Sequence, residues 1–463
     1  MMQDYAFPTV ELVTGHQDAD LIICLDQTLA PKQLSAIKVL SPKAKSWFIS
    51  GDKPTLVINA GPAKSTFDCQ TQARKWLAAL DGFEPASVHI QGTDKAWVEA
   101  LVEVLLAKQV TLPSYKKEAE VAKPLRRIST DIDLDTARLL AEARANGLVR
   151  WLTTLPASEL TPAKYRVILE ALARDHNWQL ELFDQTQLDG LGAGAFLAVS
   201  KGSDNDEAAI VRLRYRPANP RAKVAFVGKG LCFDTGGYNL KTSHMFGMHG
   251  DMGGSAVALG NLLALTELQT DLEVDCWLAL AENHIGPKAY KPNDLVRALN
   301  GTTIEVVDTD AEGRMVLADT LTLASREQPA VLFDYATLTG ACIRAIGTAQ
   351  SGVFTSRDDW REALIAAGRQ SGERVWPFPL DEDYDSNIES DVADVKQCHP
   401  GSSCDHIDAA RFLSRFVEQG THWIHVDLSA AENKGGLGPV ASEVTGFGVR
   451  FTLEALLGGE LLK

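Results

Sequence analysis

The chain has 463 residues, a formal net charge of −16 at pH 7, and 45% hydrophobic and 23% charged residues. This length exceeds what one ordinary hydrophobic core accommodates, so we expect at least two domains. The negative net charge, together with the lack of a long basic run, argues against nucleic acid as a partner. No apolar run approaches the ~20 residues that a membrane-spanning helix needs, so no membrane partner is expected.

The N-terminal sequence M-M-Q-D-Y-A-F-P lacks the basic and apolar regions of an export signal. The seven cysteines are scattered and form no C-x-x-C pair. Such a pattern favours reduced thiols over a disulfide framework. Both features predict a cytoplasmic protein.

The first part of the chain alternates short apolar segments with helical patterns, which is typical of a small α/β domain. The polar, lysine-rich stretch Pro113–Arg127 is predicted to be a linker, so residues 1–130 form the expected N-terminal domain with its linker. The predicted strands and helices of this part are Leu21–Leu25, Thr55–Ile58, Val88–Ile90, Thr71–Leu80 and Ala96–Ala107.

The remainder, residues 131–463, is predicted to be a larger α/β domain with a central mixed sheet covered by helices. Its first helix is expected after Asp133 or Asp135, either of which can cap the N-terminus. Its strands are apolar on both faces, which indicates a sheet covered on both sides. The clearest predicted strands are Lys223–Gly228, Val274–Ala281, Ala330–Tyr335 and Trp423–Leu428, and the clearest helices are Ser255–Leu268, Leu317–Ser325 and Asp408–Phe416.

The segment Asp308–Arg314, D-T-D-A-E-G-R, carries the most informative chemical signal. Asp310 and Glu312 are two positions apart in a segment that leaves a predicted strand, so both side chains can face the same side. Facing carboxylates repel each other unless a cation lies between them, and a divalent metal ion meets that need. Taken alone, such acids are also common as helix caps.

Three upstream clusters place further acids and lysines at the ends of predicted strands and helices. They are Val227–Gly230 with the following Phe233–Gly237, then Asn239–Lys241, and then Gly250–Gly254. Such a set suits two divalent cations ~3.5–4 Å apart that share bridging carboxylates. A lysine beside two cations should lose its proton, and its neutral amine can then bind metal. The acids and amines offered are Asp234, Asp251, Asp310, Glu312, Lys229 and Lys241.

These segments resemble the catalytic core of the leucyl (cytosol) aminopeptidases, which are di-zinc metallopeptidases. Within residues 223–346 the resemblance is carried by V-G-K-G-L-C-F-D-T-G-G-Y-N-L-K, D-M-G-G-S-A, A-Y-K-P-N-D-L, D-T-D-A-E-G-R-M-V-L-A-D and A-T-L-T-G-A. A weaker resemblance extends from Trp151 to the C-terminus. Several motifs in order are more specific than any one of them. The resemblance implies an enzyme that removes N-terminal residues from peptides.

The resemblance also implies a ligand set for two Zn²⁺ or Mn²⁺ ions. Lys229, Asp234, Asp251 and Glu312 match the tighter metal site. Asp234, Asp310 and Glu312 match the more exchangeable one. The family further implies a homo-hexamer with active sites that face an interior chamber.

By the same resemblance, Lys241 and Arg314 are the two catalytic positions. Lys241 would stabilise the oxyanion that forms at the scissile carbonyl. Arg314 would hold a bicarbonate-like anion that passes a proton to the leaving amine. The substrate-binding positions implied are Met248, Thr337, Leu338 and Gly340.

Four residues depart from the family pattern without removing a ligand. Thr154 and Asp308 stand where asparagine is usual, His249 replaces a basic residue, and Met315 replaces leucine. Asp308 adds negative charge near the expected metal ions.

Two other functions stay open from the sequence. One is a two-metal phosphoesterase, and the other is a non-enzymatic scaffold or DNA-binding regulator. Cys398, His399, Cys404 and His406 also offer a separate zinc site, although their spacing is not that of a zinc finger. The histidines at positions 16, 89, 176, 244, 284, 422 and 425 show no ligand spacing and are expected to be ordinary.

Overall fold

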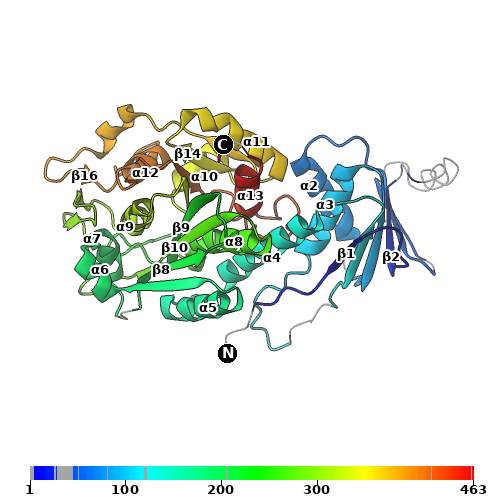
Figure 1. Ribbon diagram of the computed structural model, residues 1–463. Helices are drawn as coiled ribbons and strands as arrows, with labels where there is room; N and C mark the ends of the chain where they lie inside the picture. Colours follow the sequence, from blue (N-terminus) through cyan, green and yellow to red (C-terminus); the bar gives the residue numbers. More distant parts are fainter. Residues whose placement is uncertain are drawn as a thin grey trace.

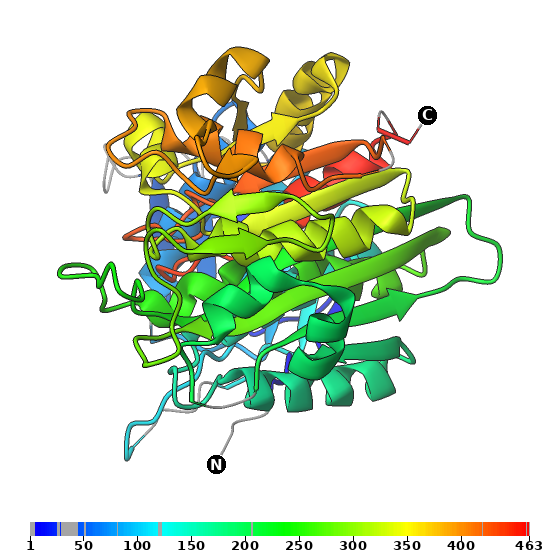
Figure 2. The ribbon, with the colours of Figure 1, turned by 90° about the vertical axis from the view of Figure 1, so that its left-hand side faces the viewer.

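The computed structural model describes residues 5–25, 28, 45–50, 52–80, 82–118, 123–204, 207–418, 420–459 and 461–462. Its two main sheets are separate in sequence: one lies within residues 11–130 and the other within residues 179–427 (Figure 1). In Figure 2 the larger sheet and its helices lie in front, and the blue elements of the smaller part lie behind them. Within the described residues, no helix combines the length and apolar composition that crossing a membrane requires.

Among the described residues, the first sheet has six strands in the order β1-β6-β5-β2-β4-β3, all parallel except the β3–β4 pair. Two helices, α2 (Thr66–Leu77) and α3 (Lys95–Ala107), supply much of its hydrophobic core. The strands are β1 (Glu11–Thr14), β2 (Leu21–Leu25), β3 (Ser46–Ile49), β4 (Thr55–Ile58), β5 (Ser87–Gln91) and β6 (Arg127–Thr130).

In the part of the chain that the structure describes, the second sheet has eight strands in the order β15-β14-β17-β13-β9-β10-β8-β7. Its centre, β17-β13-β9-β10, is parallel, whereas β8, β7 and the β14–β17 pair are antiparallel. The predicted mixed α/β sheet is therefore confirmed. The strands are β7 (Gln179–Asp184), β8 (Ala209–Tyr215), β9 (Ala222–Asp234), β10 (Leu272–Asn283), β13 (Val331–Ala336), β14 (Ser351–Thr355), β15 (Val375–Pro377) and β17 (Trp423–Asp427).

Helices cover both faces of this sheet, as the apolar strands predict. Phe226 on β9 belongs to the core shared with one group of helices, and its neighbour Val227 belongs to the core shared with the other. On the first face lie α4 (Thr136–Thr154), α5 (Pro162–Asp175), α8 (Gly253–Glu267), α11 (Arg361–Ser371) and α13 (Val449–Leu457). On the second lie α6 (Gln185–Leu191), α7 (Gly194–Ser200), α9 (Glu312–Arg326) and α12 (Asp405–Ser414).

The shorter elements include a further sheet, one short helix and several 3₁₀ helices. A small third sheet has the order β11-β12-β16. Its strands are β11 (Leu295–Arg297), β12 (Thr303–Glu305) and β16 (Val395–Lys396). The remaining elements are α10 (Gly340–Ile346) and the 3₁₀ helices η2 (Ala78–Leu80), η3 (Met248–Met252), η4 (Asp358–Trp360) and η5 (Glu382–Ile388).

Several predicted boundaries were wrong, in each case because a polar end carries no apolar periodicity. Helix α2 begins at Thr66, where the Ser65 side chain caps it by accepting a hydrogen bond from the Asp68 backbone N–H. Helix α9 begins at Glu312 instead of Leu317. Arg127 is the first residue of β6 and not part of a linker, and residues 119–122 of the predicted linker lie outside the described part.

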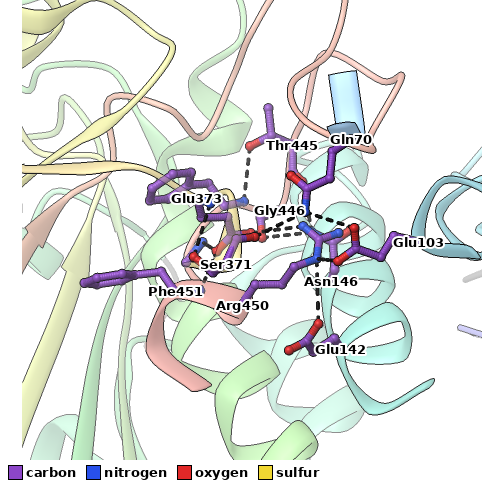
Figure 3. Close-up of polar contacts among 12 residues, drawn as sticks. Gln70, Glu103, Glu142, Asn146, Ser371, Glu373, Thr445, Gly446, Arg450 and Phe451 are labelled. Atoms are coloured by element: carbon purple, nitrogen blue, oxygen red, sulfur yellow. Dashed lines mark hydrogen bonds and ion pairs between the residues drawn. The ribbon is translucent and has the colours of Figure 1, made fainter. Parts of the chain in front are cut away.

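A buried ionic cluster joins the two parts of the molecule (Figure 3). Arg450 on α13 lies among three carboxylates, with nitrogen–oxygen distances of 3.7 Å to Glu103, 3.9 Å to Glu142 and 3.4 Å to Glu373. Glu103 belongs to α3, beside the first sheet, whereas the other residues belong to elements around the second. Gln70 on α2 bridges the same junction, because its amide donates to Glu103 and to the Ser371 carbonyl.

Candidate metal centre

The predicted ligands meet at the carboxyl end of the parallel strands in the second sheet, where α/β proteins commonly bind ligands. Lys229 and Asp234 both lie on β9, which is longer than predicted and runs to Asp234. Asp251 lies in η3, just before α8, and Glu312 is the first residue of α9. Asp310 lies in the turn that precedes α9.

One half of the cluster is centred on the amine of Lys229, which is almost fully buried. Its Nζ donates to Asp251 Oδ1 at 2.9 Å and to the Thr337 carbonyl at 3.1 Å, and it lies 3.0 Å from Glu312 Oε1. The Thr337 hydroxyl donates to the same Asp251 oxygen at 2.8 Å. Lys229 therefore connects η3, α9 and the end of β13.

The other half is centred on Lys241. Its Nζ lies 2.8 Å from Asp234 Oδ2 and 2.5 Å from Asp310 Oδ1. Asp234 is oriented by two further donors: the Asn283 side-chain amide and the Gly236 backbone N–H each lie 2.8 Å from its Oδ1. The strand ends of β9 and β10 thus fix this carboxylate before any ligand binds.

Burial and crowding of charge shift the pKa values of several of these groups. Burial alone would lower the pKa of Lys229, but Asp251, Glu312 and Asp234 outweigh it and raise that pKa. The pKa of Glu312 is raised by burial and then by the charge of Asp234. Burial also raises the pKa of Asp251. These carboxylates are costly to ionise together, so additional positive charge would stabilise them.

The donor set fits divalent cations. Asp234, Asp310 and Glu312 each offer an oxygen atom, and these atoms lie within 4.8 Å of one another. Glu312 Oε2 is buried and has no hydrogen-bond partner among the described residues. Four carboxylates against two amines leave an excess of negative charge in a largely buried site. Carboxylate oxygens together with an amine nitrogen suit Mn²⁺ or Zn²⁺.

A cavity of about 370 Å³ opens beside this cluster. Lys241, Asp310 and Glu312 line it on one side. Arg314 also lines the cavity. Its Nη2 donates a hydrogen bond to Asp405 at 2.9 Å, and its Nη1 donates one to the Gln397 carbonyl at 3.1 Å. The Nε of Arg314 is buried without a hydrogen-bond partner in the described part of the chain. A buried guanidinium beside a polar cavity can bind an anion.

Two of the four predicted substrate-binding residues line this cavity. Leu338 and Gly340 are on its wall, whereas Thr337 and Met248 are not. Thr337 contacts Asp251, and half-buried Met248 begins η3, the helix that carries Asp251.

Three residues that support the site were not found from the sequence. The side chain of Gln397 accepts from the backbone N–H groups of Val307 and Asp308 and donates to the Ala311 carbonyl. It therefore fixes the loop that carries Asp310. Asp427, at the end of β17, accepts from the Thr339 hydroxyl at 2.7 Å. Asn283 orients Asp234. Their roles depend on contacts between distant segments, which no local spacing signals.

One interpretation of the sequence needs correction. Asp310 and Glu312 do not alternate along a strand: β12 ends at Glu305, and a turn followed by the start of α9 brings the two carboxylates together. The Cys398–His406 segment, whose spacing is not that of a zinc finger, does not gather into a metal-binding group among the described residues. His406 instead packs against Phe378, with ring centroids 4.5 Å apart.

Comparisons with known proteins agree with this geometry. A model of the cytosol aminopeptidase family, catalytic domain, matches residues 147–453. A probable cytosol aminopeptidase of Synechococcus sp. (strain CC9605) is 40% identical over 365 residues, which cover 75% of this chain and 73% of that relative. Another, of Persephonella marina (strain DSM 14350 / EX-H1), is 34% identical over 388 residues, which cover 81% of this chain and 77% of that relative.

Similarity to a solved structure extends over nearly the whole chain. The bottromycin maturation enzyme BotP in complex with Mn aligns with a TM-score of 0.84 and 30% identity, covering 96% of this chain and 100% of that one. The resemblance seen in the sequence motifs is thereby confirmed. The chain belongs to the cytosol aminopeptidase family, and it is accordingly a metal-dependent, leucyl aminopeptidase-like hydrolase.

Proposed function

We propose that this protein hydrolyses the N-terminal peptide bond of peptides with two divalent cations held by the cluster around Lys229 and Lys241. The observation that carries the proposal is the convergence of four carboxylates and two amines beside the cavity that Arg314 lines. Membership of the aminopeptidase family supports the same reaction.

Lys229, Asp234, Asp251 and Glu312 would hold the tighter ion, and Asp234, Asp310 and Glu312 the more exchangeable one. Zn²⁺ or Mn²⁺ fits these ligands, and the related BotP is described in complex with Mn. When bound, the two cations would polarise the scissile carbonyl and activate a water molecule for attack. Lys229 has to lose a proton to become a ligand, so metal binding should release protons and weaken at low pH.

Lys241 and Arg314 would act on the substrate from the cavity side of the cluster. Lys241 can donate to the oxyanion that develops as the carbonyl is attacked. Arg314 would bind a bicarbonate-like anion, which accepts a proton and returns it to the leaving amine. The unpartnered Nε of Arg314 supports the anion site.

The N-terminal side chain of the substrate would lie near Met248, Thr337, Leu338 and Gly340. Of these, Leu338 and Gly340 line the cavity, and the carboxylate of Asp427 fixes their loop through Thr339. The backbone of Leu338 would form the edge that aligns the peptide.

The proposal is tested by two substrates and a chelator. Purified protein is incubated with an aminoacyl-anilide and, separately, with a phosphate ester, each before and after removal of metal. Release of the anilide product only with metal supports the proposal. Release of phosphate alone would point to a phosphoesterase, and no turnover together with a salt-stable DNA gel shift would point to a regulator.

Two substitutions separate the roles of the charged residues. Asp251→Asn should lower both bound metal and turnover, because it removes a metal ligand. Lys241→Ala should lower kcat with metal still bound. If Lys241→Ala instead removed metal and left kcat per bound ion unchanged, the proposed roles of the two lysines would be reversed.

We further propose that the protein acts in the cytoplasm as a homo-hexamer, with residues 1–130 and 131–463 as its two domains. Separate hydrophobic cores around the two sheets support the division, although Leu134 and Leu139 pack on the first core. Light scattering of the purified chain would test the assembly, since a monomeric mass at working concentrations contradicts it.

A further inference from the structure

Three side chains meet at one end of the first sheet, far from the Lys229 cluster in the sequence. His16 follows β1, His89 lies on β5, and Asp131 follows β6. Nδ1 of His16 lies 3.1 Å from Nε2 of His89, and Oδ1 of Asp131 lies 3.2 Å from the same nitrogen. A ligand atom from each of the three residues lies within 4.8 Å of the other two.

The backbone holds these three positions together. The Gly15 N–H donates to the Thr130 carbonyl at 2.8 Å, so the turn that carries His16 is fixed beside the end of β6. The Asp131 N–H donates to the Ile90 carbonyl at 3.3 Å, which fixes Asp131 beside the end of β5. The parallel pairs β1–β6 and β5–β6 therefore determine the arrangement before any ligand binds.

The buried imidazole of His89 is oriented through its other nitrogen. Nδ1 of His89 lies 2.9 Å from the Ser129 hydroxyl, and that hydroxyl lies 3.5 Å from the Val88 carbonyl, which can only accept. In the tautomer of His89 that carries its proton on Nδ1, Ser129 accepts from Nδ1–H and turns its own proton to Val88. This leaves Nε2 with a free lone pair that points at His16 and Asp131. A histidine that donates one N–H to a fixed acceptor is the usual arrangement of a metal ligand.

With the His89 proton on Nδ1, hydrogen bonding among the three residues does not satisfy the contact between His89 and Asp131. A single proton from His16 can lie between the two imidazole nitrogens, but Asp131 then faces Nε2 of His89 with lone pairs on both atoms. A cation bound by all three atoms removes that repulsion. In a tetrahedral zinc site with bonds of about 2.0–2.2 Å, neighbouring ligand atoms lie roughly 3.3–3.6 Å apart. The observed separations of 3.1 and 3.2 Å are close to this range.

We propose that His16, His89 and Asp131 bind a divalent first-row transition-metal ion, with water completing the coordination. Two imidazoles and one carboxylate are typical ligands of Zn²⁺ and similar ions. His16 and Asp131 are exposed, so the ion can enter from solvent. The site would link the end of β1 to the ends of β5 and β6. It is independent of the proposed peptidase centre, because it shares neither a residue nor a sheet with it.

The test counts bound ions in the full chain. Wild-type protein and the variants His16→Ala and Asp131→Asn are stripped with chelator, dialysed against Zn²⁺ and analysed by elemental analysis. The wild type should retain one more ion per chain than either variant, with peptidase activity per chain unchanged. Asp133→Asn is the matched control, because Asp133 is an exposed acid in the same loop that contacts Thr14 and not the histidines.

A second measurement locates the ion and guards against altered folding. Crystals of the Zn²⁺-loaded wild type should show an anomalous peak at the zinc edge between His16 and His89, and His16→Ala crystals should lack it. Equal ion counts in the wild type and both variants, or no peak at these residues, would overturn the proposal. Circular dichroism of each variant confirms that a lost ion does not reflect a lost fold.

Discussion

Gly313 lies directly against the amine of Lys229: a methyl group at the Gly313 Cα would come within 2.6 Å of both Nζ and Cε. On its other sides the amine is held by Asp251 at 2.9 Å and by the Thr337 carbonyl at 3.1 Å. A side chain at residue 313 would therefore have to displace the Lys229 amine from its present position among these groups.

Gly313→Ala should weaken metal binding by roughly 10- to 100-fold, the range for changes beside metal ligands. The methyl group would push Nζ of Lys229 away from Asp251 and Glu312, and turnover should fall with metal occupancy. Elemental analysis and anilide turnover measure both effects. Gly190→Ala is the matched control, since a methyl group at Gly190 on α6 meets nothing within 4 Å. Full occupancy in Gly313→Ala would show that Lys229 is not a metal ligand.

Gln397→Leu should destabilise the protein and lower turnover. Gln397 is fully buried and makes three hydrogen bonds to the backbone between Val307 and Ala311, so leucine would leave those groups unsatisfied. Each unsatisfied buried group costs about 1–3 kcal/mol. Urea unfolding measures the loss, and Gln179→Leu at an exposed position on β7 is the control. A variant with wild-type stability and kcat would contradict the positioning role of Gln397.

The sequence predicted those parts of the fold whose signal is local. Strands β2 and β4 occur with the predicted bounds, because β2 is an apolar run between two aspartates and β4 is a β-branched and apolar run between Pro54 and Asn59. The start of α9 was missed because Glu312 and Arg314 face the site and not the core, so apolar periodicity begins only at Met315. Helix α2 begins with a polar turn for the same reason.

The carboxylates and lysines that meet in the candidate metal centre could be named from the sequence because motifs keep them at fixed spacing along the chain. The residues that orient them could not. Gln397 acts on a loop that lies 86 to 90 residues before it in the chain, and Asn283 at the end of β10 acts on Asp234 at the end of β9. His16, His89 and Asp131 looked ordinary in sequence because only the pairing of β1, β6 and β5 brings them together.

Removal of metal should lower the unfolding midpoint without disrupting the fold. Ion pairs of Lys229 and Lys241 with Asp251 and Asp234 give the site internal partners that do not depend on a bound cation. An ion that binds only the native state adds about 2.7 kcal/mol at a hundredfold excess over its Kd. Thermal unfolding with chelator, and then with added Zn²⁺ or Mn²⁺, measures the change.

The same titration in His16→Ala isolates the contribution of the peptidase centre from that of the histidine site. Adding Asp251→Asn to the His16→Ala variant should remove most of the change in unfolding midpoint that metal still causes. An unfolding midpoint that changes neither with chelator nor with added metal would contradict metal binding at the Lys229 cluster.

The last prediction concerns Glu103, the carboxylate of α3 in the cluster around Arg450 (Figure 3). Burial raises the pKa of Glu103 to about 7 from an ordinary 4.5; the charge of Glu142 adds to this, whereas Arg450 and Gln70 oppose it. The folded state therefore binds the proton more tightly than the unfolded chain. The contribution of the Glu103 proton to the free energy of unfolding is fully present below about pH 4.5. It is lost as the pH rises through about 7.

Replacing this group with one that cannot titrate should flatten the pH dependence. Between pH 4.5 and 8, the unfolding free energy of the wild type should fall by on the order of 3 kcal/mol more than that of Glu103→Gln. Glutamine keeps an oxygen that can accept from Gln70, so packing at the junction is retained. Urea unfolding at several pH values measures the difference, and Glu170→Gln on the exposed face of α5 controls for the loss of one charge. If the unfolding free energies of the wild type and Glu103→Gln changed with pH in parallel, Glu103 would be ionised in the folded protein. Arg450 would then compensate for its burial.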